Sequence, residues 1–315
     1  MDRKLISVIV PCYNEQEALP FFFEEIDKVI AEMSDCDFEV IYVDDGSKDK
    51  TLSILRERAA VDNHTRYVSF SRNFGKEAGM LAGLRESKGD YVCIMDADLQ
   101  DPPSLLPQMM SIIAEKGCDS VATRRGNRDG EPPVRSFFAK MFYRIMNKIS
   151  KVEFVSGARD YRLMSRRMVD AVLSMSEYNR FSKGIFSWVG YKTEWLTFDN
   201  VERVAGNTKW SFWGLFKYSL ECIVAFSTAP LAISSFCGFI MFLTSIVGAL
   251  AIIIRKLIDS SSSVSGWASN VCIILLVGGL QLLCLGILGQ YLSKTYLETK
   301  HRPDYIVAET EKDKK

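Results

Sequence analysis

Residues 91–103 read YVCIMDADLQDPP, an apolar run that leads straight into a group of carboxylates. The apolar part, residues 91–95, predicts a buried strand. Asp96 and Asp98 follow at once, and two carboxylates at the end of a buried strand are costly unless a cation lies between them. A divalent metal such as Mg²⁺ suits this position, because it takes oxygen ligands and is often held by one or two carboxylates together with nucleotide phosphates. The alternative interpretation is a turn that merely ends the strand, since Asp is common in turns.

Strand and helix patterns alternate four times over roughly the first 100 residues. Short apolar strands are predicted at residues 7–10, 38–43, 67–70 and 91–95. Helical patterns follow them: one from about residue 18 to 32, one opened by Asp49 and Thr51, and one after the Gly-rich turn that begins at Arg72. This alternation predicts an α/β fold with a doubly wound, mainly parallel sheet.

Polar segments follow the predicted strands at 11–15, 44–47, 71–73 and 96–101. In a doubly wound sheet the ligand lies beyond the carboxyl ends of the strands, so these segments should meet at one edge. No GxGxxG follows the first strand and no GxxxxGK[ST] occurs, which disfavours a dinucleotide-binding dehydrogenase and a P-loop NTPase. Without a glycine cradle, a bound diphosphate would need a metal, and Asp96 and Asp98 could hold it.

The overall composition excludes several classes of protein. Lysine and arginine total 39, as do aspartate and glutamate, so no net charge favours nucleic acid as a partner. The 8 cysteines show no CxxC or Cys/His metal spacing, which predicts reduced thiols and not a disulfide framework. The apolar run at 5–12 is too short for a signal peptide.

The chain contains two long stretches without Asp, Glu, Lys or Arg, which are residues 222–254 and 266–293. Each exceeds the roughly 20 residues that a membrane-spanning helix needs. We expect transmembrane helices at 228–254 and 268–293, joined by a short loop at 255–267; the alternative is two buried helices of a soluble core. Basic residues are more numerous near the two chain ends than in the loop, so the positive-inside rule favours a multi-pass protein with a 294–315 tail and both termini in the cytoplasm.

Two further segments have the pattern of helices that lie in the membrane interface. In the segment 134–151, Phe137, Met141, Ile145 and Ile149 recur every four residues beside a basic row of Lys140, Arg144 and Lys148. The segment 210–227 carries Trp210, Trp213 and Tyr218, which suit the headgroup layer. The alternative for the first segment is ordinary packing against the core of the domain.

Several motifs, in their order and spacing, resemble those of the family-2 nucleotide-sugar glycosyltransferases. They are VIVPCYNE (8–15), YVDDGSKDKT (42–51), SRNFGKEAG (71–79) and MDADLQDPP (95–103). SGARDYRLMSRR (156–167) and ERVAGNTKW (202–210) resemble the polyprenyl-phosphate branch, which includes dolichol-phosphate mannose synthases and bacterial bactoprenol glucosyltransferases. The resemblance covers residues 5–227, and the hairpin resembles the bacterial bactoprenol type. It implies a GT-A type transferase domain over residues 1–209.

The resemblance also implies roles for the donor side of the site. Pro11, Tyr13 and Glu15 would line the nucleoside pocket, and Val43 and Asp45 would hold the base and ribose. Asp96, Ala97 and Asp98 would contact the sugar nucleotide, and Asp96, Asp98 and Gln100 would bind Mg²⁺ or Mn²⁺. Arg203 and Lys209 would bind the donor diphosphate through a loop that closes around Gly206. A plain turn remains the alternative for Tyr13 and Glu15, and a surface turn for Gln100.

On the acceptor side, the resemblance implies that Asp160 is the catalytic base. A lipid phosphate is already largely anionic at pH 7, because its second pKa is about 6, so Asp160 would orient the acceptor or take its last proton. The alternative is a helix cap or an ion pair with Arg159 or Arg162. Arg124 and Arg135 would bind the acceptor phosphate, since guanidinium groups pair well with phosphate oxygens; a solvated surface role is the alternative.

Together these features predict the inverting transfer of one sugar to a membrane polyprenyl (undecaprenyl) phosphate for cell-envelope glycosylation. UDP-glucose is the expected donor, although similar chains handle galactose, N-acetylglucosamine and aminoarabinose. The resemblance also implies the bacterial inner membrane and a homotetramer. A processive polysaccharide synthase is an alternative, but that branch carries a QxxRW motif, which is absent, and more membrane helices. An inactive membrane scaffold is another, but the DxD pair and Asp160 are intact.

Overall fold

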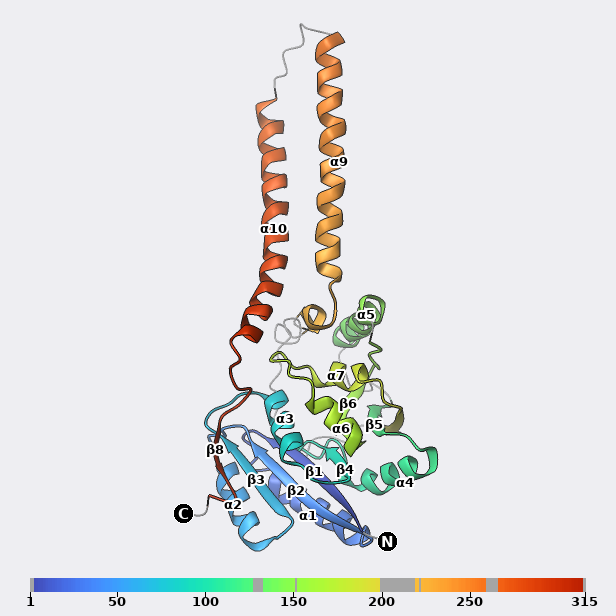
Figure 1. The fold of residues 1–315 in the computed structure, drawn as a ribbon, viewed down its shortest axis with the longest axis vertical. Helices are drawn as coiled ribbons and strands as arrows, with labels where there is room; N and C mark the ends of the chain where they lie inside the picture. Colours follow the sequence, from blue (N-terminus) through green and yellow to red (C-terminus); the bar gives the residue numbers. More distant parts are fainter. Residues whose placement is uncertain are drawn as a thin grey trace. The chain divides into compact units, whose positions relative to one another are not determined.

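A computed structural model describes residues 3–126, 133–150, 152–198, 219–220, 222–258 and 266–313. The chain divides into two compact units. The first comprises Met1–Lys148, Val152–Phe216 and Arg302–Lys315, and the second comprises Ile149–Lys151 and Lys217–His301. The chain therefore leaves the first unit, builds the second and returns to the first (Figure 1).

The first unit is built on a sheet with the strand order β7-β5-β6-β4-β1-β2-β3-β8 among the described residues. The strands are β1 (Lys4–Cys12), β2 (Cys36–Asp44), β3 (Thr65–Phe70), β4 (Tyr91–Ile94), β5 (Ser120–Arg125), β6 (Ala158–Ser165), β7 (Thr193–Phe198) and β8 (Val307–Thr310). Parallel pairs join β1 to β2 and β4, β2 to β3, and β5 to β7. Strand β6 is antiparallel to β4 and β5, and β8 to β3. The predicted doubly wound, mainly parallel sheet is confirmed.

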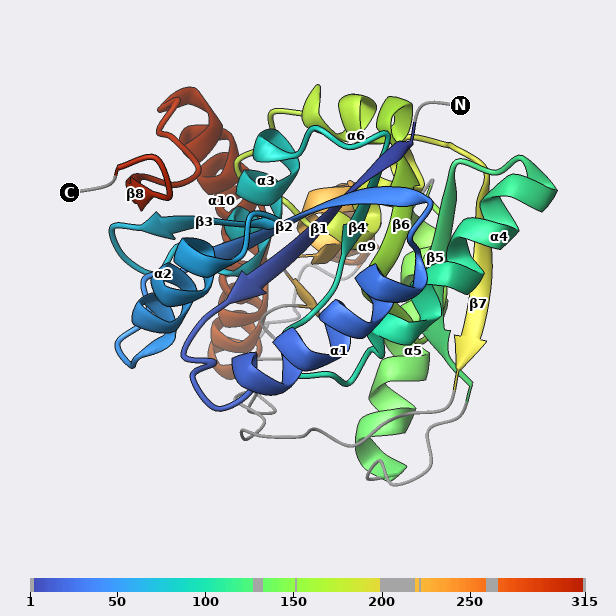
Figure 2. The same cartoon turned by 90° about the horizontal axis from the view of Figure 1, so that it is seen from below.

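Helices cover both faces of this sheet, which is why strands β1, β2 and β4 are largely apolar. The helices are α1 (Leu19–Glu32), α2 (Thr51–Val61), α3 (Lys76–Glu86), α4 (Leu106–Lys116), α5 (Pro133–Ile149), α6 (Arg166–Leu173) and α7 (Ser182–Trp188), with a 3₁₀ turn η1 (Pro103–Leu105) before α4. Figure 2 shows α3 and α6 on one face and α1 on the other.

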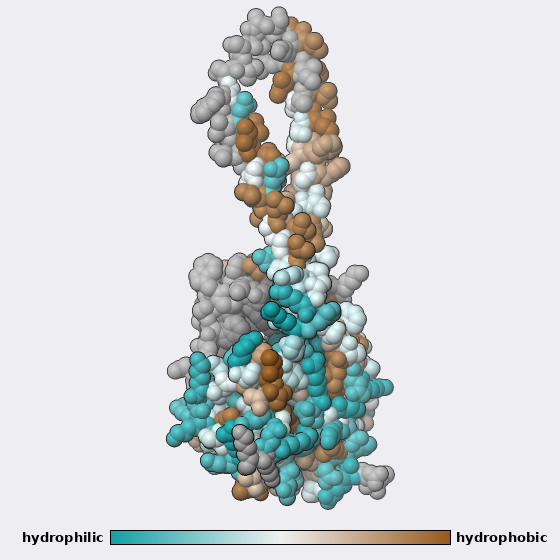
Figure 3. Space-filling model, turned by 60° about the vertical axis from the view of Figure 1, so that its left-hand side comes forward, coloured by the Kyte–Doolittle hydropathy of each residue, from teal (hydrophilic) through white to brown (hydrophobic). Residues whose placement is uncertain are grey.

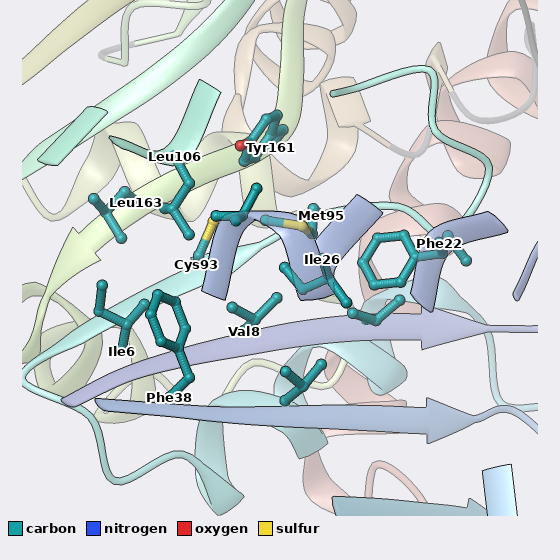
Figure 4. Close-up of a cluster of buried hydrophobic side chains, with 14 of the residues drawn as sticks. Ile6, Val8, Phe22, Ile26, Phe38, Cys93, Met95, Leu106, Tyr161 and Leu163 are labelled. Carbon is teal, nitrogen blue, oxygen red and sulfur yellow. The ribbon is translucent and has the colours of Figure 1, made fainter. Parts of the chain in front are cut away.

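Side chains at alternate positions of the strands point to opposite faces of the sheet and pack into two separate hydrophobic cores. On one face, Ile6 and Val8 of β1 pack with Phe22 and Ile26 of α1 (Figure 4). On the other, residues of β2 and β3 pack against α3. Helix α3 lies so close to β1 that a Cβ on Gly83 would come within 2.2 Å of Ile9 Cγ2, so this crossing requires glycine.

The second unit contains two long helices, α9 (Ala229–Ile258) and α10 (Trp267–Thr299). The stretches Ala229–Ile252 and Leu276–Thr299 are long and apolar enough to cross a membrane. Their side chains are largely exposed, including Phe236 and Leu282, and Figure 3 shows hydrophobic residues along both helices. Both helices extend beyond the predicted 228–254 and 268–293. Of the 210–227 segment, residues 210–218 and 221 lie outside the described residues.

Candidate active site

The loops that follow β1 and β2 are held together by hydrogen bonds at one edge of the sheet. The backbone N–H of Asn14 donates to Ser47 Oγ at 2.9 Å, and that of Glu15 donates to Thr51 Oγ1 at 2.8 Å. Asn14 adopts a positive φ of 54°, which asparagine tolerates better than most residues. Pro11, Tyr13 and Glu15 are each half-buried here, in the loop that the motif analysis assigned to the nucleoside pocket.

Asp45 ties the end of β2 to the start of α3. Its carboxylate accepts hydrogen bonds from the backbone N–H of Phe74 at 2.6 Å and of Gly75 at 2.9 Å. Burial raises the pKa of Asp45, partly offset by these two hydrogen bonds. Both oxygens thus already position the loop before Lys76. Val43 is fully buried in the core under α3, between β1 and β3.

Lys76, the first residue of α3, lies between the first carboxylate after β4 and the carboxylate on β6. Its Nζ is 2.7 Å from Asp96 Oδ1 and 2.6 Å from Asp160 Oδ2. Two carboxylates that share one ammonium avoid the repulsion they would otherwise exert on each other. The strand-end acidic residue and the predicted catalytic base are therefore brought together at this edge, with Lys76 joining them.

Lys183, on α7, approaches the other oxygen of the same carboxylate. Its Nζ lies 3.7 Å from Asp160 Oδ1. Burial by itself would raise the pKa of Asp160, but the charges of Lys183 and Lys76 outweigh it and hold that pKa well below its ordinary value. Asp160 is consequently a carboxylate at any pH near neutrality. Desolvation by itself would lower the pKa of Lys76, but the charges of Asp160 and Asp96 outweigh it and raise that pKa, so the ammonium stays charged.

Glu77 connects the two helices that carry these lysines. The backbone N–H of Ser182 donates to Glu77 Oε2 at 3.0 Å, and the Ser182 hydroxyl donates to the same oxygen. Desolvation raises the pKa of Glu77 to about 7, against the effect of these hydrogen bonds and with a further contribution from nearby Asp160. The start of α3 is thereby fixed to the start of α7.

The turn after β4 presents the second carboxylate. Asp98 is buried, and its Oδ1 accepts a hydrogen bond from the backbone N–H of Gln100 at 3.1 Å. Leu99 between them has a φ of 56°, a conformation that costs a leucine about 1–2 kcal/mol and is therefore imposed by its surroundings. Ala97 is also buried, and Asp96 beside it is half-buried.

The residues of this turn fit a hard divalent cation. No group of three or more His, Cys, Asp or Glu side chains is gathered as a ligand set within the part of the chain that is described. Mg²⁺ and Mn²⁺ do not need one, because one or two carboxylates suffice when substrate phosphates supply further oxygens. The carboxylate of Asp96 attracts positive charge, since the ammonium group of Lys76 lies against it. Asp96, Asp98 and Gln100 are thus suitable ligands.

Within the described part of the chain, neither arginine considered as an alternative partner makes an ion pair with Asp160, although the charge of Arg162 also acts to lower the pKa of Asp160. Arg159 Nε lies 2.9 Å from Asp101 Oδ1. Arg162 is buried, with its guanidinium 3.9 Å from the centre of the Phe186 ring. Asp160 itself belongs to strand β6, so it is not a helix cap. Among the described residues, the ion pairs of Asp160 are with Lys76 and Lys183.

The predicted phosphate-binding residues are only partly described. Arg124 is exposed at the end of β5, and its Nε donates to Thr197 Oγ1 at 3.0 Å. Arg135 lies in α5, but its side chain is outside the description, as are Arg203 and Lys209 entirely. Sequence reasoning missed Lys76 and Lys183 as site residues. Lys76 could have been found, because it lies in the motif SRNFGKEAG at the end of a strand.

Comparison with known proteins gives consistent matches over the chain. The model of the family described as glycosyl transferase family 2 matches residues 7–173. A Bacillus subtilis (strain 168) protein whose name gives it as a glycosyltransferase, CsbB, is 41% identical over 98% of this chain and 93% of its own. The prophage bactoprenol glucosyl transferase homolog of Escherichia coli (strain K12) is 38% identical over 98% and 99%. The bactoprenol glucosyl transferase of Shigella phage SfV is 38% identical over 96% and 97%.

Proposed function

The chain belongs to glycosyl transferase family 2, and from that membership we propose that it transfers glucose from UDP-glucose to a polyprenyl phosphate with inversion at the anomeric carbon. The resemblance read from the motifs is confirmed at the level of the family. The acceptor is supported by relatives named as bactoprenol glucosyl transferases, which match over nearly their whole length. Glucose is supported by the same names, and UDP by the resemblance of the C-terminal hairpin to the bacterial bactoprenol type. The product, a polyprenyl-phosphate-glucose, would serve cell-envelope glycosylation.

The observation that carries this proposal is the position of Asp160. Its carboxylate is joined through the Lys76 ammonium to Asp96, so the predicted acceptor end and the predicted donor end of the reaction share one cation. In-line transfer requires these two ends to be close together, because the acceptor oxygen must reach the anomeric carbon from the side opposite the departing diphosphate. The short distances from Lys76 to both carboxylates support the proposal in this respect.

On the donor side, Pro11, Tyr13 and Glu15 would line the nucleoside pocket, and Val43 and Asp45 would hold the base and ribose. Asp96, Asp98 and Gln100 would hold Mg²⁺ or Mn²⁺, with Ala97 between them at the sugar nucleotide. A bound divalent ion would neutralise the charge that develops on the diphosphate leaving group. Arg203 and Lys209 would add positive charge to the same diphosphate.

On the acceptor side, an oxygen of the lipid phosphate forms the new bond to the anomeric carbon while the bond from that carbon to the diphosphate breaks, and UDP departs. The phosphate is largely ionised at pH 7, so little deprotonation is required. Asp160, held as a carboxylate, would orient the acceptor and take the last proton from the fraction that still carries one. Arg124 and Arg135 would offer further contacts to the phosphate.

Both units have features that suit work at a bilayer. On α5, Phe138, Met141 and Ile145 lie at positions i, i+3 and i+7 and are 43%, 39% and 41% exposed. We propose that this apolar face lies in the membrane interface, where a polyprenyl phosphate presents its head group. We propose that α9 and α10 span the bacterial inner membrane, with both termini and the catalytic domain in the cytoplasm. The homotetramer stays a prediction.

The proposal is tested by incubating the purified full-length protein with radiolabelled UDP- and GDP-sugars, undecaprenyl phosphate and Mg²⁺ or Mn²⁺. We expect an acid-labile labelled lipid from UDP-glucose. Asp98→Ala should lower transfer by about 100-fold or more and weaken metal-dependent UDP binding, because the leaving group loses its charge stabilisation. Asp170→Ala, at an exposed carboxylate on α6, is the matched control. Absence of transfer from every donor, with Asp98→Ala binding nucleotide as tightly as wild type, would refute the proposal.

A further inference from the structure

Two helices begin beside the Asp160 carboxylate, and each supplies a lysine to it. Helix α3 begins at Lys76 and α7 at Ser182, next to Lys183. The Nζ of Lys76 lies 2.6 Å from one carboxylate oxygen and the Nζ of Lys183 lies 3.7 Å from the other. Each oxygen of Asp160 therefore faces its own ammonium group.

This pairing is fixed by a neighbouring contact and is not a chance meeting of surface lysines. Glu77 follows Lys76 and Ser182 precedes Lys183 in the chain, and Glu77 accepts two hydrogen bonds from Ser182. Ser182 is buried. A desolvated carboxylate with two charge-assisted hydrogen bonds holds the two helix starts at a set separation, and so it sets the separation of the two lysines.

The two ammonium groups differ in the hydrogen-bond donors they have left. A lysine ammonium carries three N–H donors. Those of Lys76 are directed to Asp96 and Asp160. Lys183 Nζ makes no hydrogen bond to any of the residues that the structure describes, and its 3.7 Å separation from Asp160 is too long for one. Its side chain is 31% exposed, so its donors are open to a ligand.

The balance of charge at Asp160 favours a phosphate as that ligand. A carboxylate on its own would repel an anionic phosphate, and a catalytic base must nevertheless lie against the acceptor that it serves. Two lysines around one carboxylate leave a net positive charge once Asp96 is engaged by a donor-bound cation. A phosphate monoester, with about −1.5 to −2 charges at pH 7, is attracted to such a site and can accept from several N–H groups.

We propose that Lys183, together with Lys76, forms the subsite that binds the phosphate monoester of the acceptor against Asp160. This inference rests on the proposed function, since it takes the acceptor to be a lipid phosphate. The β-phosphate of the donor has the same chemistry, so the test must separate the two sources. Lys183 is the residue that can distinguish acceptor phosphate from donor phosphate, because Lys76 also contacts Asp96 on the donor side.

The experiment measures binding without turnover. Full-length wild type, Lys183→Met and Lys183→Arg are titrated with radiolabelled undecaprenyl phosphate in detergent micelles, with UDP and Mg²⁺ present, and separately with UDP alone. We expect Lys183→Met to weaken lipid-phosphate binding roughly 10- to 100-fold, the effect of losing one charge-assisted hydrogen bond, while UDP binding stays within about twofold of wild type. Lys183→Arg should restore most of the affinity. Lys28→Met, at an exposed lysine on α1, should match wild type.

The outcomes separate this inference from the proposed function. Equal lipid-phosphate binding by wild type and Lys183→Met overturns the subsite, even where wild type transfers glucose. Weakened UDP binding with unchanged lipid binding assigns Lys183 to the donor and also overturns it. If wild type binds the lipid phosphate in a Lys183-dependent way but transfers no sugar, the subsite stands and the proposed function fails. Where Lys183→Met does not fold, as judged by thermal unfolding, Lys183→Gln replaces it.

Discussion

Glu77 is the residue whose protonation most directly affects the join between α3 and α7. Its pKa is raised from 4.5 to about 7, chiefly by desolvation. The folded protein thus holds this proton more tightly than the unfolded chain, so the protonated group contributes stability below pH 4.5 that is lost as the pH rises to about 7. Because glutamine cannot ionise, the Glu77→Gln variant should not lose this stability as the pH rises.

The change is measured as the difference in unfolding free energy between Glu77→Gln and wild type at several pH values. The difference should shift in favour of the variant by about 2 kcal/mol between pH 4.5 and pH 8, since about 3 kcal/mol is expected for a fully buried group and partial exposure reduces it. Comparing variant with wild type cancels the titration of other carboxylates. A difference that does not vary with pH would contradict the raised pKa.

At the scale of residues, motifs identify the acidic members of the site and miss their partners. Asp96 and Asp98 stand out because carboxylates at the end of a buried strand need a reason to be there, whereas Asp160 is found only through the family resemblance of its motif. Lys183 carries no such local sign, since α7 around it reads as an ordinary short helix. Its role depends on a meeting of residues far apart in the chain, which composition and spacing do not encode.

At the scale of elements, the C-terminal strand β8 was predicted only as part of a cytoplasmic tail. Four residues with little apolar alternation give almost no strand signal. The structure shows β8 as an edge strand paired antiparallel with β3. Arg56 Nε on α2 donates to Glu309 Oε1 at 2.7 Å, and Arg66 Nε on β3 donates to Glu311 Oε1, just after β8, at 3.1 Å. Strands β5, β6 and β7 were also not predicted, because polar residues interrupt their apolar pattern.

Tyr305, just before β8, links the C-terminal segment through Phe70 to the loop that precedes Lys76. Its ring stacks on Phe70 at 4.8 Å, and Phe70 meets Phe74 edge to face at 5.8 Å. Tyr305→Ala should lower the unfolding free energy by about 1–3 kcal/mol, through loss of apolar burial and an aromatic pair, and should weaken UDP-glucose binding by disturbing the loop. Thermal unfolding and donor titration measure these effects. Tyr296→Ala, at an exposed tyrosine on α10, is the control, and indistinguishable behaviour of the two variants would count against the link.

At the scale of the whole molecule, the long uncharged stretches predict membrane attachment, and two helices of the structure are long and apolar enough to cross a membrane. The exposed apolar face of α5 adds an independent prediction. Replacing Phe138, Met141 and Ile145 together by Ser should reduce transfer to undecaprenyl phosphate in vesicles by about tenfold or more, because each side chain contributes apolar area to the interface. UDP-glucose binding should be unchanged.

The control for this triple variant is Val61→Ser, at an exposed apolar side chain on α2. An equal loss of donor binding and lipid transfer in the triple variant would show that α5 acts through the fold of the domain and not through the bilayer.

The most direct test of the central claim is a single-turnover measurement on wild type and Asp160→Asn with UDP-glucose and undecaprenyl phosphate, with the anomeric configuration of the lipid product determined by NMR. We predict an inverted product from wild type and a rate about 100-fold or more lower for Asp160→Asn, with UDP-glucose binding unchanged. A retained configuration, or an Asp160→Asn rate equal to that of wild type, would contradict the account.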